Sequence, residues 1–500
     1  MKKNNNFNNR KIYSIFLDNK LIIFSFSLVI TAILLFFVGY MMKSFNIILL
    51  SILLAWIANL SVALSNFKRG IYFLFFNITF FTFIFSGNIF KMFSGDIWHN
   101  FSSNIEIKTN IIIFSALLSL FFGYVILYFV NRFDKRECEY FPLKNTRIKG
   151  FVQKYSLIIF CISLFLSFLI VIEKVAFVFE NSYLDFYTSF NSTIPTVFHN
   201  LSSFLLPSLL LYLFTFPKIK RVIGILIPFS IYVFLTLGTG SRSTFVLSIL
   251  IILIYFIYSQ FNKIYFVFNK RRIVWFVVFG FLGVSFLCSF NLIRNRAPIK
   301  NYNPIYYFKQ FFVDQSTSIN VIKNAEKYKS DLRSMNKNYT FSNFVSFYKY
   351  SSLFKIFRLG KKPYPIYQNN TLEMALYGDS LGQTISYLAL GDKYLQGHGL
   401  GTEYLAELYI DFDIWGIIVY NVLLGCILYF FSNISVGNFI LNTYIFLVIY
   451  RILYMPRENA SNWMMEFFSI KNFILICMPY LIYQIVIKNK RSKNENTVDC

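Results

Sequence analysis

A short glycine-rich turn contains the first residues whose types and spacing suit the binding of a charged ligand. Positions 238–244 read Gly-Thr-Gly-Ser-Arg-Ser-Thr and lead into an apolar stretch. Glycines let a backbone approach a ligand closely, a helix N-terminus attracts anions, and an arginine binds phosphate through two parallel hydrogen bonds. Arg242, with Ser241 and Ser243 beside it, is therefore a candidate phosphate-binding residue. The alternative is an arginine that anchors a helix at the level of the lipid headgroups.

Four further arginines favour the same chemistry. Arg294 and Arg296 follow one apolar stretch, Arg451 lies near the end of another, and Arg457 comes soon after it. Each of them alone is typical of an anchor at the membrane interface. Together with Arg242 they predict a cationic cluster that suits a diphosphate or another anionic headgroup.

Acidic residues at a regular spacing form a second candidate group. Glu403, Glu407 and Asp411 are four residues apart, so a helix places them on one face. An acidic residue in a first helical turn also favours the helix dipole, which is the structural explanation for Glu403. Carboxylates next to an apolar stretch, such as Glu407 and Asp411, are costly unless they are paired or face water. Glu407 and Asp411 are therefore candidate site residues beside Glu403, and His398, which precedes them in the same motif-like stretch, is a candidate for a catalytic or binding role.

The sequence contains no motif typical of a metal or cofactor site. Its six cysteines show no CxxC pair and no regular spacing, and HExxH, GxSxG and Rossmann patterns are absent. Positions 238–244 lack the Gly-Lys-Ser/Thr ending of a P-loop. Asp411-Phe412-Asp413 superficially matches the metal-binding DxD of nucleotide-sugar glycosyltransferases, but its predicted location outside the cytoplasm argues against that role. We expect no metal and no cofactor.

Apolar stretches of membrane-spanning length position all of these residues. The chain has 500 residues, is 56% apolar and has a mean hydropathy of +0.54, and a bilayer core needs about 20 apolar residues per helix. The predicted fold is an all-α polytopic membrane protein of 12 helices. We expect helices 1–9 in residues 1–292, one large loop in residues 293–407, and helices 10–12 with a tail in residues 408–500. The predicted spans are 21–41, 44–64, 71–90, 109–130, 155–179, 197–216, 221–237, 243–260, 273–292, 408–431, 438–455 and 470–487.

The distribution of Lys and Arg predicts the orientation, because positive residues are enriched in cytoplasmic segments. With the N-terminus inside, the inner segments hold 25 Lys and Arg and the short outer loops hold 5. Both termini are then cytoplasmic, and the loop 293–407 lies outside the membrane. The net charge of +25 is explained as an orientation signal, so nucleic acid is not an expected partner. The first apolar stretch is too long for a signal peptide and should remain as a helix.

Two segments of the long loop are amphipathic, Ile305–Val313 and Phe341–Phe357. We expect them to lie on the membrane surface or to cover a cavity. The loop is also rich in tyrosine, a residue whose ring stacks on sugars and whose hydroxyl forms hydrogen bonds with them.

Two of these motifs together resemble a known family. The first is Gly240-Ser241-Arg242-Ser243-Thr244 at the start of a helix, and the second is the run from Tyr404 to Phe412 followed by Gly425. With the helix count and the late outer loop, they resemble the O-antigen polymerases, or Wzy-type oligosaccharide repeat-unit polymerases. One departure is visible, because the family usually has Phe-Gly where this chain has Phe412-Asp413.

The resemblance implies a bacterial glycosyltransferase of the inner cell membrane that makes O-antigen or capsular polysaccharide. Its substrate would be an oligosaccharide on undecaprenyl diphosphate at the outer leaflet, and membrane lipids would surround it. Arginines on the outer face would neutralise the departing diphosphate without a metal, and a carboxylate or histidine would take the proton of the acceptor hydroxyl. Glu407 would be the preferred base and His398 the second choice, whereas Glu403 and Asp411 would bind substrate. A flippase and a chain-length regulator of the same pathway would be its protein partners.

Two alternatives remain open from the sequence. An O-antigen ligase uses the same lipid donor and also has a large late outer loop, but the run from Ala406 to Phe412 favours the polymerase. A transporter or flippase of lipid-linked oligosaccharide would show internal repeats and polar residues near the bilayer midplane. The polar residues of this chain instead gather at the predicted outer side, which favours chemistry at the membrane surface.

Overall fold

The computed structural model describes residues 2–95, 101–132, 146–181, 185–240, 242–269, 304–351, 364–434 and 438–495, with a few isolated positions between them. In these ranges the chain is helical and forms no strand. Eleven helices there are long and apolar enough to cross a membrane. The predicted class, an all-α polytopic membrane protein, is confirmed. The remaining predicted span, 273–292, lies outside the described residues.

The chain divides into two compact units. The first contains residues 1–137, 270–434 and 452–462, and the second contains residues 138–269, 435–451 and 463–500. The first unit therefore combines the N-terminal spans with most of the predicted loop and the helix that follows it. The predicted division at residue 408 falls inside that helix, which begins at Tyr404.

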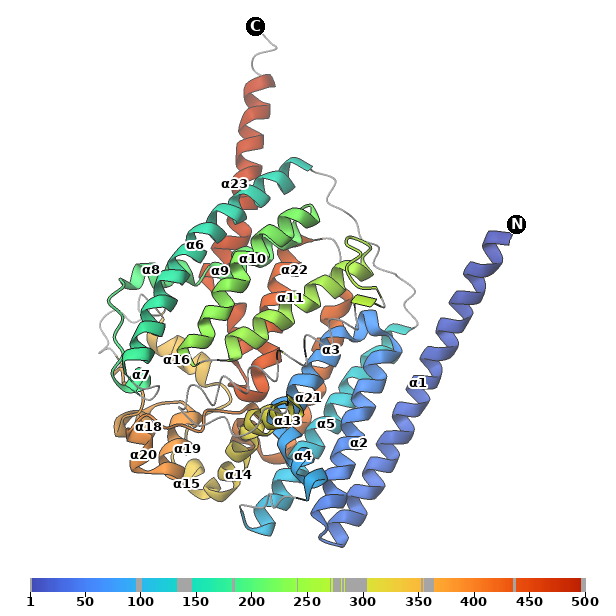
Figure 1. Cartoon of the computed structure of the whole chain (residues 1–500), viewed down its shortest axis with the longest axis vertical. Helices are drawn as coiled ribbons and strands as arrows, with labels where there is room; N and C mark the ends of the chain where they lie inside the picture. The colour runs from blue at the N-terminus through green and yellow to red at the C-terminus, as the bar shows by residue number, and fades with distance from the viewer. Residues whose placement is uncertain are drawn as a thin grey trace. The chain divides into compact units, whose positions relative to one another are not determined.

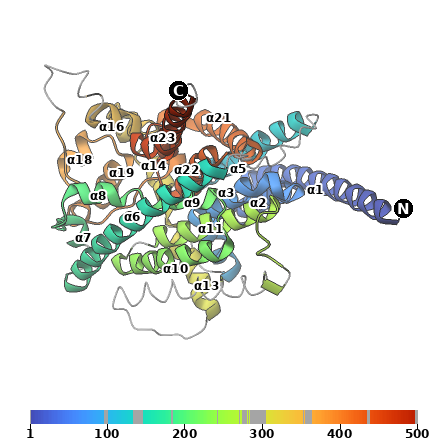
Figure 2. The same ribbon diagram turned by 90° about the horizontal axis from the view of Figure 1, so that it is seen from above.

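In the first unit, α1, α2, α3 and α5 lie side by side, and α21 packs against α3 and α5 (Figures 1 and 2). Small residues allow this close packing, as is common between membrane helices. A Cβ atom added to Gly425 would lie 2.5 Å from the carbonyl oxygen of Leu120, and one added to Gly123 would lie 2.1 Å from that of Val422. The bounds are α1 (Lys2–Met41), α2 (Phe45–Ser65), α3 (Phe67–Phe80), a π-helical turn (Phe81–Phe85), α4 (Ser86–Ser94), α5 (Ser103–Arg132) and α21 (Tyr404–Ile434).

Helices α5 and α21 run in the same direction. Near their beginnings, Glu326 accepts hydrogen bonds from Lys108 of α5 at 2.5 Å and from the Tyr409 hydroxyl of α21 at 2.6 Å. Near their ends, the rings of Tyr124 and Tyr429 are 5.2 Å apart. The start of α21 therefore lies at the same end of the unit as the start of α5.

Short helices of the predicted loop gather at this end (Figure 1). A buried ion pair of 2.8 Å between Lys323 and Glu106 ties α14 to the first turn of α5. The amphipathic segments predicted in the loop both contain helices, α13 and α16. The bounds are α13 (Pro304–Gln315), α14 (Ile319–Lys327), α15 (Lys329–Ser334), α16 (Ser342–Tyr350), α18 (Leu372–Tyr377), α19 (Leu381–Leu390) and α20 (Asp392–Leu395).

The second unit contains the middle spans and the last two. Its core is aromatic and aliphatic, with the rings of Phe214 and Phe446 only 4.6 Å apart and the Tyr255 hydroxyl donating to the carbonyl of Leu213 at 2.8 Å. The bounds are α6 (Thr146–Glu180), α7 (Asp185–Thr188), α8 (Thr196–Ser202), α9 (Leu205–Phe214), α10 (Ile219–Leu235), α11 (Ser243–Phe261), α22 (Phe439–Tyr454, of which the last residues belong to the first unit) and α23 (Ile470–Glu495).

Candidate functional site

Glu403 is the N-cap of α21. Its Oε2 accepts a hydrogen bond from the backbone N–H of Ala406 at 2.9 Å, which satisfies one of the free donors of the first turn. The side chain is fully buried, and burial raises its pKa to about 8 although the first-turn N–H groups favour the charged form. At neutral pH this carboxyl is therefore mostly protonated.

Glu407 is the centre of a buried polar junction. One carboxylate oxygen accepts from the Thr402 hydroxyl at 2.8 Å and from the Asn459 amide at 2.5 Å, and the other accepts from the Ala460 N–H at 2.8 Å. No part of the side chain is exposed. Glu407 thus joins the start of α21 to the segment 455–462 between the last two spans, and a solvent-borne substrate does not reach it in this conformation.

A break in α21 places the next two acids. Asp413 has φ 56° and ψ −155° inside the helix, a backbone conformation that suits glycine. The carbonyls of Tyr409 and Ile410, just before the break, accept hydrogen bonds from Arg333 of α15. Arg333 also pairs with the Asp413 carboxylate at 2.7 Å. Asp413 therefore stands where the helix changes direction, at the position where the family that the sequence resembles usually has glycine.

Asp411, just before the break, faces the loop helices. Its carboxylate accepts from the backbone N–H of Thr340 at 2.7 Å, in the turn before α16. Asp413 carries a second ion pair, to Lys329 at 2.5 Å. The three predicted acids, Glu403, Glu407 and Asp411, are thus all engaged with protein groups. Asp411 and Asp413 fix the loop helices to α21.

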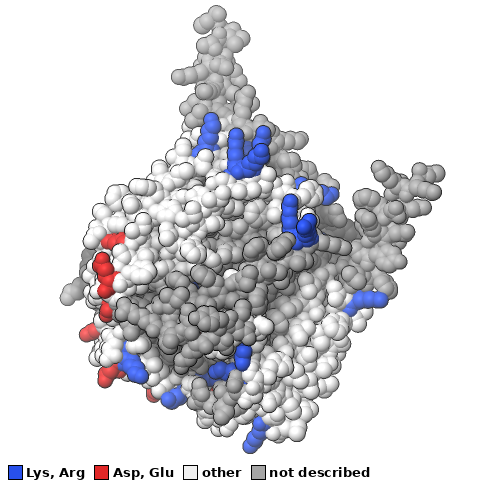
Figure 3. All heavy atoms as spheres, in the orientation of Figure 1, with Lys and Arg blue, Asp and Glu red and all other residues white. Residues whose placement is uncertain are grey.

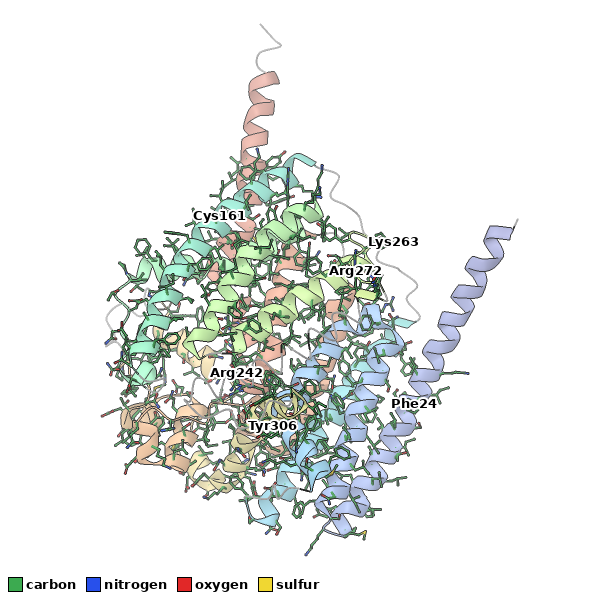
Figure 4. The ribbon with its side chains drawn as sticks, in the orientation of Figure 1. Phe24, Cys161, Arg242, Lys263, Arg272 and Tyr306 are labelled. Carbon is green, nitrogen blue, oxygen red and sulfur yellow. The ribbon has the colours of Figure 1, made fainter. Side chains whose placement is uncertain are left out.

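Arg242 is the N-cap residue of α11 and is half-buried. The preceding turn is a short 3₁₀ helix, Thr236–Thr239, that ends at Gly240 with φ 82°, a conformation that requires glycine. The predicted turn that leads into a helix is therefore present, and Ser243 is the first residue of α11. Figure 4 labels Arg242 and Lys263 at opposite ends of this helix. Ser241 lies outside the described residues.

The other predicted arginines differ in their partners. Arg451 pairs with Glu466 at 2.8 Å, a carboxylate that already balances its charge. Arg457 donates to the neutral Gln315 amide oxygen at 2.9 Å and lies over the ring of Phe83. Neither of these two contacts provides a negative charge that would balance the charge of Arg457. Arg294 and Arg296 lie outside the described residues.

His398 is an exposed residue in the turn between α20 and α21. Its backbone N–H donates to the carbonyl of Lys393 at 3.1 Å, so the turn is closed locally. An exposed imidazole beside the loop helices is accessible to a large polar substrate.

A polar cavity of about 180 Å³ lies in the same unit, between α16, the segment 366–380 and Asn459. Asn459 connects it to the Glu407 junction, since its amide donates both to Glu407 and to the Ser342 hydroxyl, at 3.3 Å for the latter. The lining residues used below are Ser342, Asn343, Ser346, Tyr350, Tyr367 and Asp379.

Sequence reasoning missed the partners that hold this region together. Arg333 and Lys329 are more than 75 positions from the α21 residues they bind, and Asn459 is 52 positions from Glu407. No local spacing signals such pairs. For the positive φ at Asp413 the sequence did offer one indication, because this chain has an aspartate where the family usually has a glycine.

The architecture defines a multi-pass membrane protein with polar loop helices and a cavity at the end where α5 and α21 begin. A family model described as O-antigen polysaccharide polymerase Wzy matches residues 22–490, and the chain belongs to this family. The comparisons with curated proteins and with solved structures found no match. The predicted family is confirmed.

Membership defines the activity at a coarse level. The protein is a glycosyltransferase-type polysaccharide polymerase that acts on lipid-linked oligosaccharide repeat units. The ligase and the transporter, the two alternatives from the sequence, are not favoured by this match.

Proposed function

We propose that this polymerase joins undecaprenyl-diphosphate-linked repeat units at the outer face of the bacterial inner membrane, without a metal, and works with a flippase and a chain-length regulator. The observation that carries the proposal is the family match over residues 22–490. Both termini are cytoplasmic in this proposal, the predicted loop is extracytoplasmic, and the reaction takes place on the side of the loop.

Charge within the second unit supports this orientation. Lys and Arg gather over the ends where α6 and α10 begin, and acidic side chains gather over the other end of α6 (Figure 3). The basic residues there include Lys218, Lys220 and Arg221, whereas Glu180 and Asp185 belong to the opposite end. Positive residues are enriched on the cytoplasmic side, so Arg242, opposite to Lys263, falls on the outer side.

The direction of α21 supports the location of the loop. Four of the candidate spans lie between the end of α5 and the start of α21. Four crossings alone would return the chain to the side where α5 ends, yet α21 starts at the end where α5 starts. An odd number of crossings is needed, and the predicted span 273–292, outside the described residues, would supply the fifth.

The proposed reaction is a displacement at the anomeric carbon of the donor. A hydroxyl of the acceptor sugar attacks this carbon, the bond from the carbon to the phosphate oxygen breaks, and undecaprenyl diphosphate leaves with the electron pair. The hydroxyl proton passes to a base. Cationic groups that bind the diphosphate more strongly as its charge develops lower the barrier, and no metal is required for that role.

Among the candidate residues, the contacts favour particular roles. Arg242 is the first choice for the diphosphate, and Arg457 is the next because its bonded partner is neutral. His398 is the preferred base because it is exposed. Glu407 is assigned a positioning role through Asn459, since its side chain is fully buried and its hydrogen bonds are all to protein groups. Arg294, Arg296 and Arg451 remain candidate ligands of the diphosphate, and Ser241, Ser243, Glu403 and Asp411 remain candidates for substrate contacts.

The test uses purified protein in liposomes with a synthetic lipid-linked repeat unit and a chelator. We expect the wild-type protein to polymerise in the presence of the chelator. Arg242→Ala should lower the rate by roughly a hundredfold, the effect typical of losing one group that stabilises developing charge. Arg221→Ala, an exposed arginine at the opposite side of the same unit, is the matched control and should retain activity. Normal activity in Arg242→Ala would remove this residue from the site, and loss of polymer with the chelator would refute metal independence.

A further inference from the structure

The cavity beside Asn459 has the size of a small subsite. Its volume of about 180 Å³ is below the roughly 300–1,000 Å³ typical of sites for drug-sized ligands. A whole oligosaccharide repeat unit does not fit such a space, whereas one sugar ring does.

The walls suit a ligand with many hydroxyl groups. Ser342, Ser346 and Asn343 offer hydroxyl and amide groups, and Tyr350 and Tyr367 add aromatic rings. The Nδ2 atom of Asn343 is buried and has no hydrogen-bond partner among the described residues. Buried polar groups are almost always paired, and this unpaired donor belongs to a residue of the cavity wall.

The charges at the cavity do not favour the diphosphate end of the substrate. Asp379 is the one charged residue among those that line the cavity, and its carboxylate pairs with Lys349 at 2.6 Å. A diphosphate would meet a carboxylate here and no arginine. An uncharged sugar would instead find the Asp379 oxygens as acceptors for its hydroxyl groups.

We propose that this cavity binds the terminal sugar of the incoming repeat unit, at the end that carries the attacking hydroxyl. The inference rests on the proposed function and deepens it. In that reaction the donor reacts at the carbon bound to diphosphate, whereas the acceptor reacts at the end farthest from its own lipid. A neutral site in the loop matches the acceptor end and not the donor end.

In this proposal, Glu407 and Asn459 position the wall of the acceptor cavity. The Asn459 amide is held by the buried Glu407 carboxylate and in turn holds Ser342 of the cavity wall. The run from Tyr404 to Phe412 thus acts on the acceptor through the cavity wall.

Binding to the full-length protein in nanodiscs tests the proposal. The probe is the repeat-unit oligosaccharide freed of lipid and diphosphate, and a second probe lacks its terminal non-reducing sugar. Ser346→Trp fills the cavity, Tyr367→Ala removes one wall, and Ser330→Trp is the matched control on an exposed position of α15. We expect roughly tenfold weaker binding of the full probe to both cavity variants, unchanged binding to the control, and a similar loss for the shortened probe with the wild-type protein.

Three outcomes would overturn the proposal. The first is that a folded Ser346→Trp protein binds the full probe as tightly as the wild type does. If that variant does not fold, the second is that Tyr367→Ala binds the full probe as tightly as the wild type does. The third is that the wild-type protein binds the shortened probe as tightly as the full probe. Each of these leaves the proposed function intact if the wild-type protein still polymerises. A wild-type protein that binds the sugar and makes no polymer would instead contradict the proposed function.

Discussion

At the scale of single residues, the acids of α21 serve three different purposes. Glu403 caps the helix, Glu407 holds the segment 455–462, and Asp411 holds the turn before α16. Their regular spacing indicated a shared helical face, but their environments separate them. Burial and long-range partners decide the role of each one, and these are not visible in the spacing.

Glu403 makes the stability of this helix start dependent on pH. Its pKa is about 8 in the folded protein and near 4.3 in an unfolded chain. Because the folded value is raised, the stabilisation is complete below the unfolded pKa and is lost as the pH rises toward 8. We expect hydrogen exchange of the amides at 404–407 to speed up between about pH 5 and pH 8, after correction for intrinsic exchange.

Glu403→Gln should remove this dependence, because the amide keeps the capping oxygen and cannot ionise. Glu403→Ala should open the first turn at every pH, by about 1 kcal/mol for a lost cap. An unchanged pH dependence in Glu403→Gln would show that another group is responsible.

Asp413 offers a direct test of backbone strain. Asp413→Gly relieves a positive φ that costs roughly 1–3 kcal/mol in other residues and loses two half-exposed ion pairs, which contribute little. Asp413→Ala loses the same pairs and keeps the strain. We therefore expect the glycine variant to unfold at a temperature equal to or above that of the wild type, and the alanine variant at a lower one. The reverse order would mean that the pairs to Lys329 and Arg333 outweigh the strain.

At the scale of elements, the sequence predicted the spanning helices well because each one is a long apolar run. Eleven of the 12 spans agree with helices of the described residues. The starts of several spans differ, and at the tenth α21 begins at Tyr404 and not at residue 408. The first turn there contains the acidic Glu407 and is nevertheless fully buried, and a hydropathy pattern cannot predict such burial.

The contact between α5 and α21 depends on two glycines. Gly425→Leu would drive a side chain into the Leu120 carbonyl, because even a Cβ atom lies 2.5 Å from it. We expect a loss of at least about 1–3 kcal/mol, as for other overpacked cores, seen as lower yield and a lower unfolding temperature in detergent. Gly224→Leu, in an open position on α10 with no atom within 4 Å of an added Cβ, is the matched control. Equal tolerance of both changes would contradict the close packing of α5 and α21.

At the scale of the whole molecule, the orientation determines where the chemistry occurs. A membrane-impermeant maleimide should label Ser330→Cys from outside in intact spheroplasts, and it should label Lys220→Cys only after the membrane is opened. Both positions are exposed in the structure. A cysteine-free background is needed because Cys161 is exposed and free. Labelling of Lys220→Cys from outside would invert the topology.

The candidate site was only partly predictable. The turn before Arg242 and the run after Tyr404 were found because they are continuous in the sequence. The cavity was not found, because α16, residues 366–380 and Asn459 come together only in the folded chain. Its residues are common serines, asparagines and tyrosines that no motif distinguishes.

The most direct test of the central claim uses one purified protein and one substrate. Wild-type protein in liposomes receives only the lipid-linked repeat unit, and the products are separated by size while released lipid diphosphate is measured. We expect a ladder in whole repeat-unit steps, still attached to lipid, with one lipid diphosphate released for each linkage formed. Products no longer than one unit, together with movement of that unit across the bilayer, would contradict the polymerase and indicate transport.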